Sequence, residues 1–404
     1  MQNRLSLIAT LLIALTFGGG FVIAQTSSGF DGGSAFSLCG PSPYKHWMTV
    51  GYANFQSDGF AVPALVVESP AGTPRAQVGL LDDPATTVLL GNEAIGDESM
   101  SGISIDSGHW LDPGRTVAVR GSLMAMGTRS AYGYPANNNT IVSRPFFNVA
   151  PSVDGFDAEL VNYPGIVDGT IDVMANTEFA TGNLGLQKNI ECFTRQAANF
   201  SRRIDARLGY RTFRLEDDLT ITEHLTSTDT SGLVQVGTTF DVTDQFSTRS
   251  VFHGVELGFL GQVQSDRWTI AAAVDVAVGN VNQEVTTSGT TTITTPAGMA
   301  ATQPFGILAV DSNSGSSDTN RFGLLSRASL DLGYQLTQRT QLKVGYNVLQ
   351  LNSVARAGDH IDTVVNGTQF DPNTPLSGPS RPSTRSVDRS LLLHGLQIGI
   401  DCRF

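Results

Sequence analysis

The chain has 404 residues, of which 43 are glycine and 15% are charged, and its formal net charge is −12. This composition excludes a disordered chain and a helical membrane protein, and the negative charge disfavours nucleic acid as a partner. Length alone is compatible with two or three soluble domains or with one large barrel that has long loops.

The N-terminus has the pattern of a secretory signal. Arg4 precedes an apolar run that ends at Ala24, and Val22 and Ala24 occupy the small-residue positions of a cleavage site after Ala24. The alternative is an uncleaved anchor helix, which the three glycines 18–20 disfavour. No later run could form a spanning helix, so any membrane insertion must use strands.

Ten later segments alternate apolar and polar residues, which is typical of strands whose two faces meet different surroundings. In chain order they are 44–55, 101–108, 116–126, 177–193, 201–221, 249–264, 268–281, 321–336, 340–351 and 391–404. The connections after the second, fourth, sixth and eighth segments are short, and all the others are long. Tight periplasmic turns and long extracellular loops alternate in this way in membrane barrels, whereas long loops are uncommon in compact soluble domains.

The last segment places Leu396, Ile398, Ile400 and Phe404 on one face, with Asp401 among those on the other. This alternation resembles the C-terminal assembly signal of bacterial outer-membrane barrels, which ends in Phe; the alternative is the last strand of a soluble sandwich. We predict an all-β, antiparallel up-and-down transmembrane barrel of about ten strands (8–12). The expected division is a signal peptide over 1–24, a periplasmic segment over 25–43 and the barrel over 44–404.

In such a barrel the charged residues of the strands must face the lumen. The predicted lumen-facing charges are Asp106, Arg120, Glu191, Arg203, Asp205, Arg207, Arg211, Glu256, Asp275, Arg327, Asp331, Lys343 and Asp401. In a narrow lumen these charges pair and fill the space, while in a wider one they form a field that filters ions. Ten strands lie near the filled end of this range.

Few residues suggest other chemistry. The three cysteines show no disulfide framework or metal spacing, and Cys192 and Cys402 are expected to face lipid. The acidic run Glu216 to Asp218 is interpreted as a solvated strand end. The histidines are scattered, and no serine-centred motif supports a barrel hydrolase, so we expect no catalytic, cofactor-binding or metal site and no enzyme activity.

Four stretches carry a family resemblance: GISIDSGHWLDPGRTVAVRGSLMAMG, SRRIDARLGYRTFRLEDDLTI, FHGVELGFLGQ and QLKVGYNVL. They look like the planctomycete outer-membrane family called putative beta-barrel porin 7, and RLEDDLTI at 214–221 is the most specific piece. The resemblance implies a barrel fold and an outer-membrane location over about Trp47 to Phe404. It transfers no solute and no catalytic residue.

Two functions therefore remain open: a narrow porin-like channel for small solutes or ions, and a surface-display barrel with little or no conductance that anchors acidic loops. The expected partners are outer-membrane lipid, the barrel-assembly machinery and, for a channel, small solutes, but not nucleic acid. The sequence leaves the oligomeric state undetermined.

Overall fold

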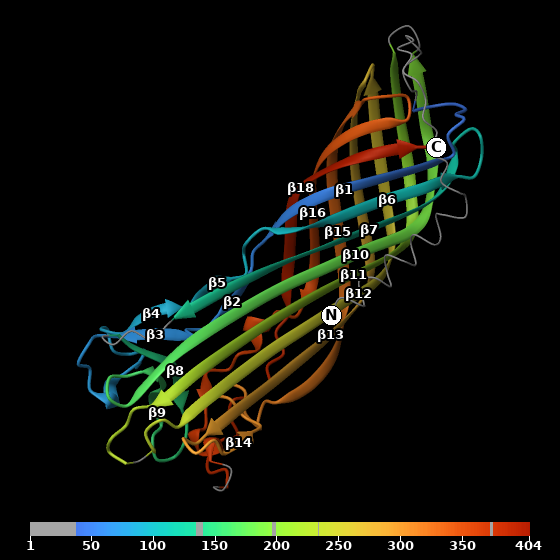
Figure 1. Cartoon of the computed structure of the whole chain (residues 1–404). Coiled ribbons are helices and arrows are strands. Elements are labelled where there is room, and N and C mark those ends of the chain that lie inside the picture. Colours follow the sequence, from blue (N-terminus) through green and yellow to red (C-terminus); the bar gives the residue numbers. More distant parts are fainter. Residues whose placement is uncertain (1–37, 135–139, 196–198, 233, 372–374) are drawn as a thin grey trace. The chain divides into compact units, whose positions relative to one another are not determined.

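The structure is a computed structural model that describes residues 38–134, 140–195, 199–232, 234–371 and 375–404. The predicted signal peptide, and the predicted periplasmic segment up to residue 37, lie outside the described residues. Ten long strands, with one short strand (Ala300–Gln303) added beside the end of β13, build the main sheet (Figure 1). They are β1 (His46–Ser57), β6 (Met100–Trp110), β7 (Val117–Tyr134), β10 (Val167–Arg195), β11 (Phe200–Ser227), β12 (Thr239–Ser265), β13 (Trp268–Thr294), β15 (Gly315–Gln335), β16 (Thr340–Val354) and β18 (Arg389–Arg403).

These strands form a closed antiparallel barrel. Each pairs with its neighbours in chain order, and β1 pairs with β18 to close the ring, from Trp47 opposite Arg403 to Ser57 opposite Leu393. Closure leaves no open edge, so the backbone polar groups are satisfied between strands. The prediction of an up-and-down barrel of about ten strands is confirmed. In the described part of the chain, no helix is both long enough and apolar enough to span a membrane.

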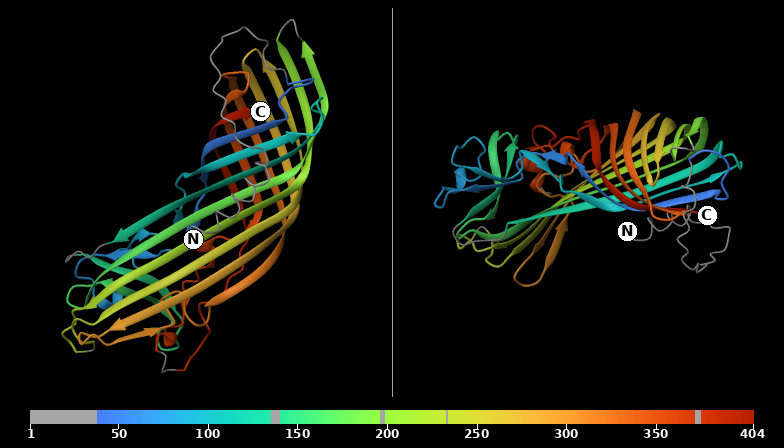
Figure 2. Two further views of the ribbon diagram at one scale, coloured as in Figure 1. Left: turned by 45° about the vertical axis from the view of Figure 1, so that its right-hand side comes forward. Right: turned by 90° about the horizontal axis from the view of Figure 1, so that it is seen from above.

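The alternation of connections also holds. Short turns follow β6, β10, β12 and β15, and they share one rim with the start of β1 and the end of β18. We call this the short-turn rim and the opposite side the long-loop side. Strands β10 to β13 have 27 to 29 residues each, whereas β1 has 12 and β6 has 11. Figure 2 shows these long strands, green to orange, continuing past the shorter ones as a wall.

The extra strand length corrects the interpretation of 223–248 and 284–320 as loops, because much of both segments is strand. Sequence periodicity underestimated these strands for a physical reason. Beyond the lipid the outer face becomes polar, so the contrast between the two faces weakens while the backbone pairing continues.

The long connections carry short elements of their own, which we call the cap. These are β2 (Phe60–Val62), β3 (Val66–Ser69), β4 (Thr87–Leu90), β5 (Glu93–Ile95), β8 (Ile141–Asn148), β9 (Gly155–Asn162), β14 (Ala300–Gln303), β17 (Val364–Val365) and the 3-10 helices Arg75–Gln77, Ala357–His360 and Gly367–Phe370. A second sheet has the order β17-β8-β3-β4, with β9 also paired to β8. Segments from three connections therefore fold together.

An apolar core joins the cap to the inner face of the wall. Phe60, Leu65 and Phe146 of the cap pack in one buried cluster with Ile221 of β11 and Phe246 of β12. Burial of apolar surface on this scale stabilises a fold rather than a set of independent loops. The expected long loops are thus largely structured.

Two arginines of the cap bind carboxylates of the wall. Arg144 of β8 donates to Glu223 and to Asp244, each at 2.6 Å, and all three side chains are at most 1% exposed. Asp244 also accepts the backbone N–H groups of residues 307, 308 and 309 at 2.8 to 3.2 Å. Arg356, which follows β16, forms an ion pair with the buried Asp217. The interpretation of this acidic region as a solvated strand end is therefore wrong for Asp217.

A disulfide holds the N-terminal segment against the short-turn rim. Cys39 is bonded to Cys192, Arg115 Nε donates to the carbonyl of Gly40 at 2.9 Å, and Arg203 Nη1 donates to that of Leu38 at 3.2 Å. The sequence prediction missed this pair because 153 positions separate the two cysteines and no spacing pattern marks them.

A β-bulge explains why Cys192 and Glu191 were placed on the wrong faces. The register of β10 with β11 shifts between Asn189 and Glu191, so the inward and outward positions exchange after the bulge. Glu191 therefore pairs with the exposed Arg202 instead of facing the lumen, and Cys192 lies opposite Arg203 instead of facing lipid.

The disulfide predicts the thiol content of the exported protein. Unfolded in denaturant without reductant, it should bind one maleimide per chain, at Cys402, and three after reduction. Mass spectrometry measures the label. Cys402→Ser should bind none without reductant, and three labels on unreduced wild type would contradict the pairing.

The cap arginine predicts a stability effect. Arg144→Met leaves two buried carboxylates without their cation, so the free energy of unfolding should fall by about 3–5 kcal/mol, measured as the urea midpoint in detergent. Arg249→Met is the matched control, because Arg249 pairs with Glu216 on the exposed face and its loss should cost less than about 1 kcal/mol. Equal losses of stability in the two variants would contradict a stabilising role for the buried ion pairs of Arg144.

Candidate functional site

The inner face of β11 shows how the lumen is layered. From the short-turn rim it presents Arg203, Asp205, Arg207, Gly209 and Arg211, then Phe213 and Leu215, then the residues that meet the cap. The same alternation turns Leu208 and Tyr210 outward, where they are 53% and 51% exposed. One strand thus contributes to a polar layer, an apolar layer and the lipid-facing surface.

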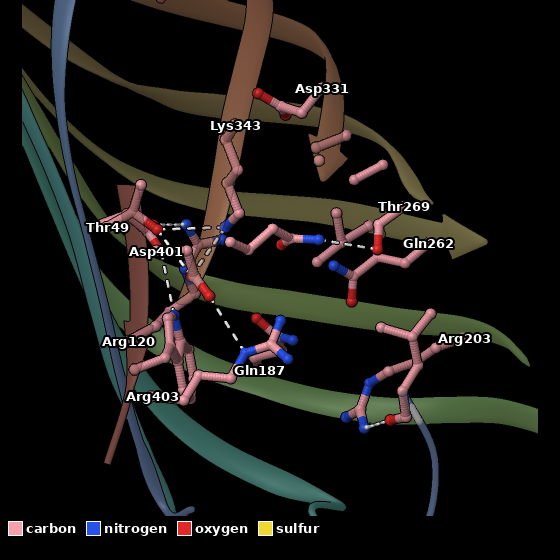
Figure 3. Close-up of a pocket in the computed structure, with 18 of the residues that line it drawn as sticks. Thr49, Arg120, Gln187, Arg203, Gln262, Thr269, Asp331, Lys343, Asp401 and Arg403 are labelled. Atoms are coloured by element: carbon pink, nitrogen blue, oxygen red, sulfur yellow. Dashed lines mark hydrogen bonds and ion pairs between the residues drawn. The ribbon is translucent and has the colours of Figure 1, made fainter. Parts of the chain in front are cut away.

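The polar layer surrounds a cavity of about 190 Å³ at the short-turn rim, which we call the vestibule. Its lining includes residues from all ten barrel strands and from the turn before β7. Figure 3 shows Lys343 extending toward Thr49 and Asp401, with Arg203 on another side of the cavity. Lys343 Nζ lies 3.0 Å from Asp401 Oδ2 and 3.2 Å from Thr49 Oγ1.

The predicted charges, Glu191 excepted, come together in this layer. Eight of them line the vestibule itself: Asp106, Arg120, Arg203, Arg207, Arg327, Asp331, Lys343 and Asp401. The other four, Asp205, Arg211, Glu256 and Asp275, lie in the wall with side chains at most 3% exposed.

Most of these charges form ion pairs between strands or along one strand. Arg120 pairs with Asp106 across the β6–β7 hairpin, Arg203 with Asp205 at 2.8 Å along β11, and Arg211 of β11 with Glu256 of β12. Asp275 lies within 3.4 Å of Arg207 and 3.6 Å of Arg327. Buried charges of both signs persist only when they are paired, which the narrow lumen enforces.

Sequence reasoning missed several polar residues of the vestibule. Gln187, Arg115 and Arg403 line the cavity, and Gln187 and Asn189 of the same strand donate to Asp205 at 2.8 and 3.0 Å. Arg403 follows the alternation of the last strand and could have been identified, whereas Arg115 lies in a turn with no periodic signal. Burial, together with the neighbouring Arg203, lowers the pKa of Arg115 to about 10.

An apolar layer follows the vestibule toward the long-loop side, and we call it the belt. All ten barrel strands contribute to its buried cluster, which contains Ala53, Phe55, Met100, Met126, Phe179, Phe213, Leu215, Phe252, Ala277, Val281, Leu325, Leu349, Leu351, Val354, Leu391 and Leu393. None of these side chains is more than 5% exposed. The belt therefore fills the cross-section of the barrel between the vestibule and the cap.

Aromatic rings form much of the belt. Phe213 and Phe179 stack with 5.7 Å between centroids, and Phe213 lies opposite Phe252 in the β11–β12 register. Gly323 makes room for this packing, because a Cβ there would lie 2.6 Å from the ring of Phe252. A glycine on β15, with β13 between it and β12, thus lets the ring of Phe252 lie against the wall.

The outer face is apolar along the C-terminal strand. Leu396, Ile398, Ile400 and Phe404 are 49% to 55% exposed, while Asp401 on the other face is 2% exposed. Tyr52 also points outward, at 55% exposed. Trp47, on the same strand as Tyr52, lines the vestibule and donates to Asp106 at 3.2 Å.

No candidate metal site was found in the described parts of the chain: they contain no group of three or more His, Cys, Asp or Glu residues placed to hold a metal ion.

Comparisons with solved structures gave distant similarities only. The outer membrane protease OmpT from Escherichia coli has a TM-score of 0.39 at 8% identity, covering 90% of this chain and 98% of that one. The Pseudomonas putida toluene transporter TodX has 0.21 at 8%, and a Pseudomonas aeruginosa FadL homologue 0.19 at 9%, each covering 90% of both chains. At these TM-scores they carry no argument about function. No curated protein matches the chain.

The family comparison is more specific. A model of the family described as Putative beta barrel porin-7 (BBP7) matches residues 47–404. This span includes every residue of the ten barrel strands except His46. This span agrees with the closed barrel, the apolar outer face and the polar inner layer described above. The chain therefore belongs to the beta barrel porin-7 family, and it is an integral β-barrel protein of the outer membrane.

Proposed function

We propose that the protein is a narrow porin-like barrel for small polar solutes or ions, closed at rest by the belt. The observation that carries this proposal is the sequence of layers along the lumen: a charged vestibule that ends at a buried apolar layer. Apolar constrictions block ions because water leaves them, and they conduct when they widen or become wet. Passage therefore requires displacement of belt side chains, and the protein has no catalytic step.

A second, smaller cavity supports the proposal that the vestibule is one end of a path through the barrel. It has about 50 Å³ and is lined by Arg211, Asn347 and Gln397 together with belt residues such as Phe55 and Leu349. The two cavities share the lining residues Asp106, Arg327 and Gln397, and the smaller one also touches the belt.

A display role is the second candidate, and the folded cap favours it. Arg144 and Arg356 hold the cap to the wall through buried ion pairs, which suits a fixed extracellular surface. In that case the barrel serves mainly as an anchor in lipid. Conductance measurements separate the two candidates, because only the first needs a path through the belt.

We also propose that the barrel-assembly machinery recognises the last strand. Leu396, Ile398, Ile400 and Phe404 form one exposed apolar row, and the backbone of Phe404 pairs with His46 at the closing seam. The row is therefore accessible before closure and faces lipid afterwards.

The belt gives a conductance prediction. The wild-type protein in planar bilayers should show small or no current steps, and the double variant Phe213→Ser/Phe252→Ser should show larger steps, because water can enter the space that the two rings leave when hydroxyls line it. The corresponding double alanine variant should conduct less than the serine variant, since an apolar gap stays dry.

Phe259→Ala is the matched control, because Phe259 is on the same strand as Phe252 but is 60% exposed on the outer face. It should conduct like the wild type. Large stable steps from the wild type would contradict a closed belt, and a serine variant that folds without conducting would favour the display role.

The last strand gives an assembly prediction. Phe404→Ala should lower the amount of folded barrel in the outer membrane severalfold, measured as heat-modifiable protein in the membrane fraction, while refolding of the purified chain in detergent changes less. Trp268→Ala removes another exposed aromatic, 51% exposed, and should leave assembly unchanged. An equal loss in detergent refolding would indicate a purely structural role for Phe404.

A further inference from the structure

The vestibule is rich in positive charge although the chain as a whole is negative. Its lining has seven cationic side chains and three carboxylates, while the chain has a net charge of −12. The cationic side chains are Arg115, Arg120, Arg203, Arg207, Arg327, Lys343 and Arg403, and the carboxylates are Asp106, Asp331 and Asp401. Arg115, with its pKa of about 10, is still charged at neutral pH.

The carboxylates that balance several of these cations are set back in the wall. Asp275, which neighbours Arg207 and Arg327, is 1% exposed and is not part of the cavity lining. Gly258 on the adjacent strand provides the space, because a Cβ there would lie 2.0 Å from Asp275 Oδ1. Asp205 is likewise fully buried behind Arg203. The guanidinium groups therefore face the cavity more than their counter-charges do.

Two of these guanidinium groups have hydrogen-bonding capacity left over. Arg120 is 5% exposed, and its Nε and Nη1 have no hydrogen-bond partner, although Nη2 donates to Asp106. Arg207 is 9% exposed, its Nε has no partner, and its Nη1 lies a long 3.4 Å from Asp275. Buried donors without acceptors are costly, so an acceptor arriving in the cavity would be stabilised.

We propose that the vestibule is a binding site for a small tetrahedral oxyanion of the phosphate or sulfate class. Planar guanidinium forks match the oxygens of such an anion, and attraction is strong at a site sheltered from water. The cavity of about 190 Å³ holds a small anion and is below the roughly 300–1,000 Å³ of sites for drug-sized ligands. The binding of the oxyanion does not depend on the proposed channel function. The inference rests on that function only where it names this oxyanion as the solute that the barrel favours.

Isothermal titration calorimetry on the folded protein in detergent tests the binding directly. Phosphate and sulfate are titrated separately into the protein in a low-salt buffer, and chloride is titrated in a third experiment as the comparison anion. We expect saturable binding of one tetrahedral oxyanion per chain, weakened by added salt, and no saturable binding of chloride. Stronger binding of phosphate than sulfate, or the reverse, identifies which oxyanion the site prefers.

Arg207→Gln should weaken that binding at least tenfold. This variant is expected to fold, because Asp275 keeps its contact with Arg327, and heat-modifiable migration checks the fold. Arg202→Gln is the matched control: Arg202 is on the same strand but pairs with Glu191 on the exposed outer side, so binding should not change. No saturable oxyanion binding by folded wild type, or an equal loss in both variants, would overturn the proposal.

Selectivity of the conducting belt variant Phe213→Ser/Phe252→Ser gives an independent readout. Its reversal potential in a salt gradient should show preference for anions, and Arg207→Gln in that background should reduce the preference. A variant that conducts with cation preference would overturn the oxyanion site and leave the channel intact. Oxyanion binding in the calorimeter without any conductance would retain the site and overturn the channel.

Discussion

The architecture depends on the pairing of charges inside a narrow barrel. Ten strands enclose too little space for charged side chains to remain hydrated separately, so they must neutralise one another or lie next to a cavity. The ion pair of Arg211 with Glu256 and the contacts of Asp275 with two arginines meet this requirement between neighbouring strands. Pairing in turn fixes which residues can line the vestibule and which are set back in the wall.

Because side chains alternate between the two faces of each strand, the inward residues of all strands together form layers along the lumen. Along β11 the inward residues change from arginines to Phe213 and Leu215, and then to Asp217 and Glu223 where the cap begins, while Leu208 and Tyr210 face outward. Each layer has its own partner: polar residues of the vestibule, aromatic rings of the belt, or arginines of the cap. The same strand therefore supports the membrane wall, the closure of the lumen and the attachment of the cap.

The belt separates two regions that have opposite electrostatic arrangements. On its short-turn side, arginines face a cavity while carboxylates lie behind them. On its long-loop side, the carboxylates Asp217, Glu223 and Asp244 belong to the wall, and the arginines come from the cap. The first arrangement leaves space for an anion, whereas in the second the protein's own cations fill the acidic positions.

The sequence by itself determined the class of fold and most of the inward charges. Alternation such as Ile398, Ile400 and Phe404 against Asp401 follows directly from a two-residue pleat between lipid and an interior, and the rhythm of short and long connections determined an up-and-down order. Only the tertiary structure decided the bulge that turns Glu191 outward, the bond between Cys39 and Cys192, and the burial of Asp217 beneath Arg356. These features depend on contacts between segments far apart in the chain, and a periodic pattern within one segment does not record which distant segment packs against it.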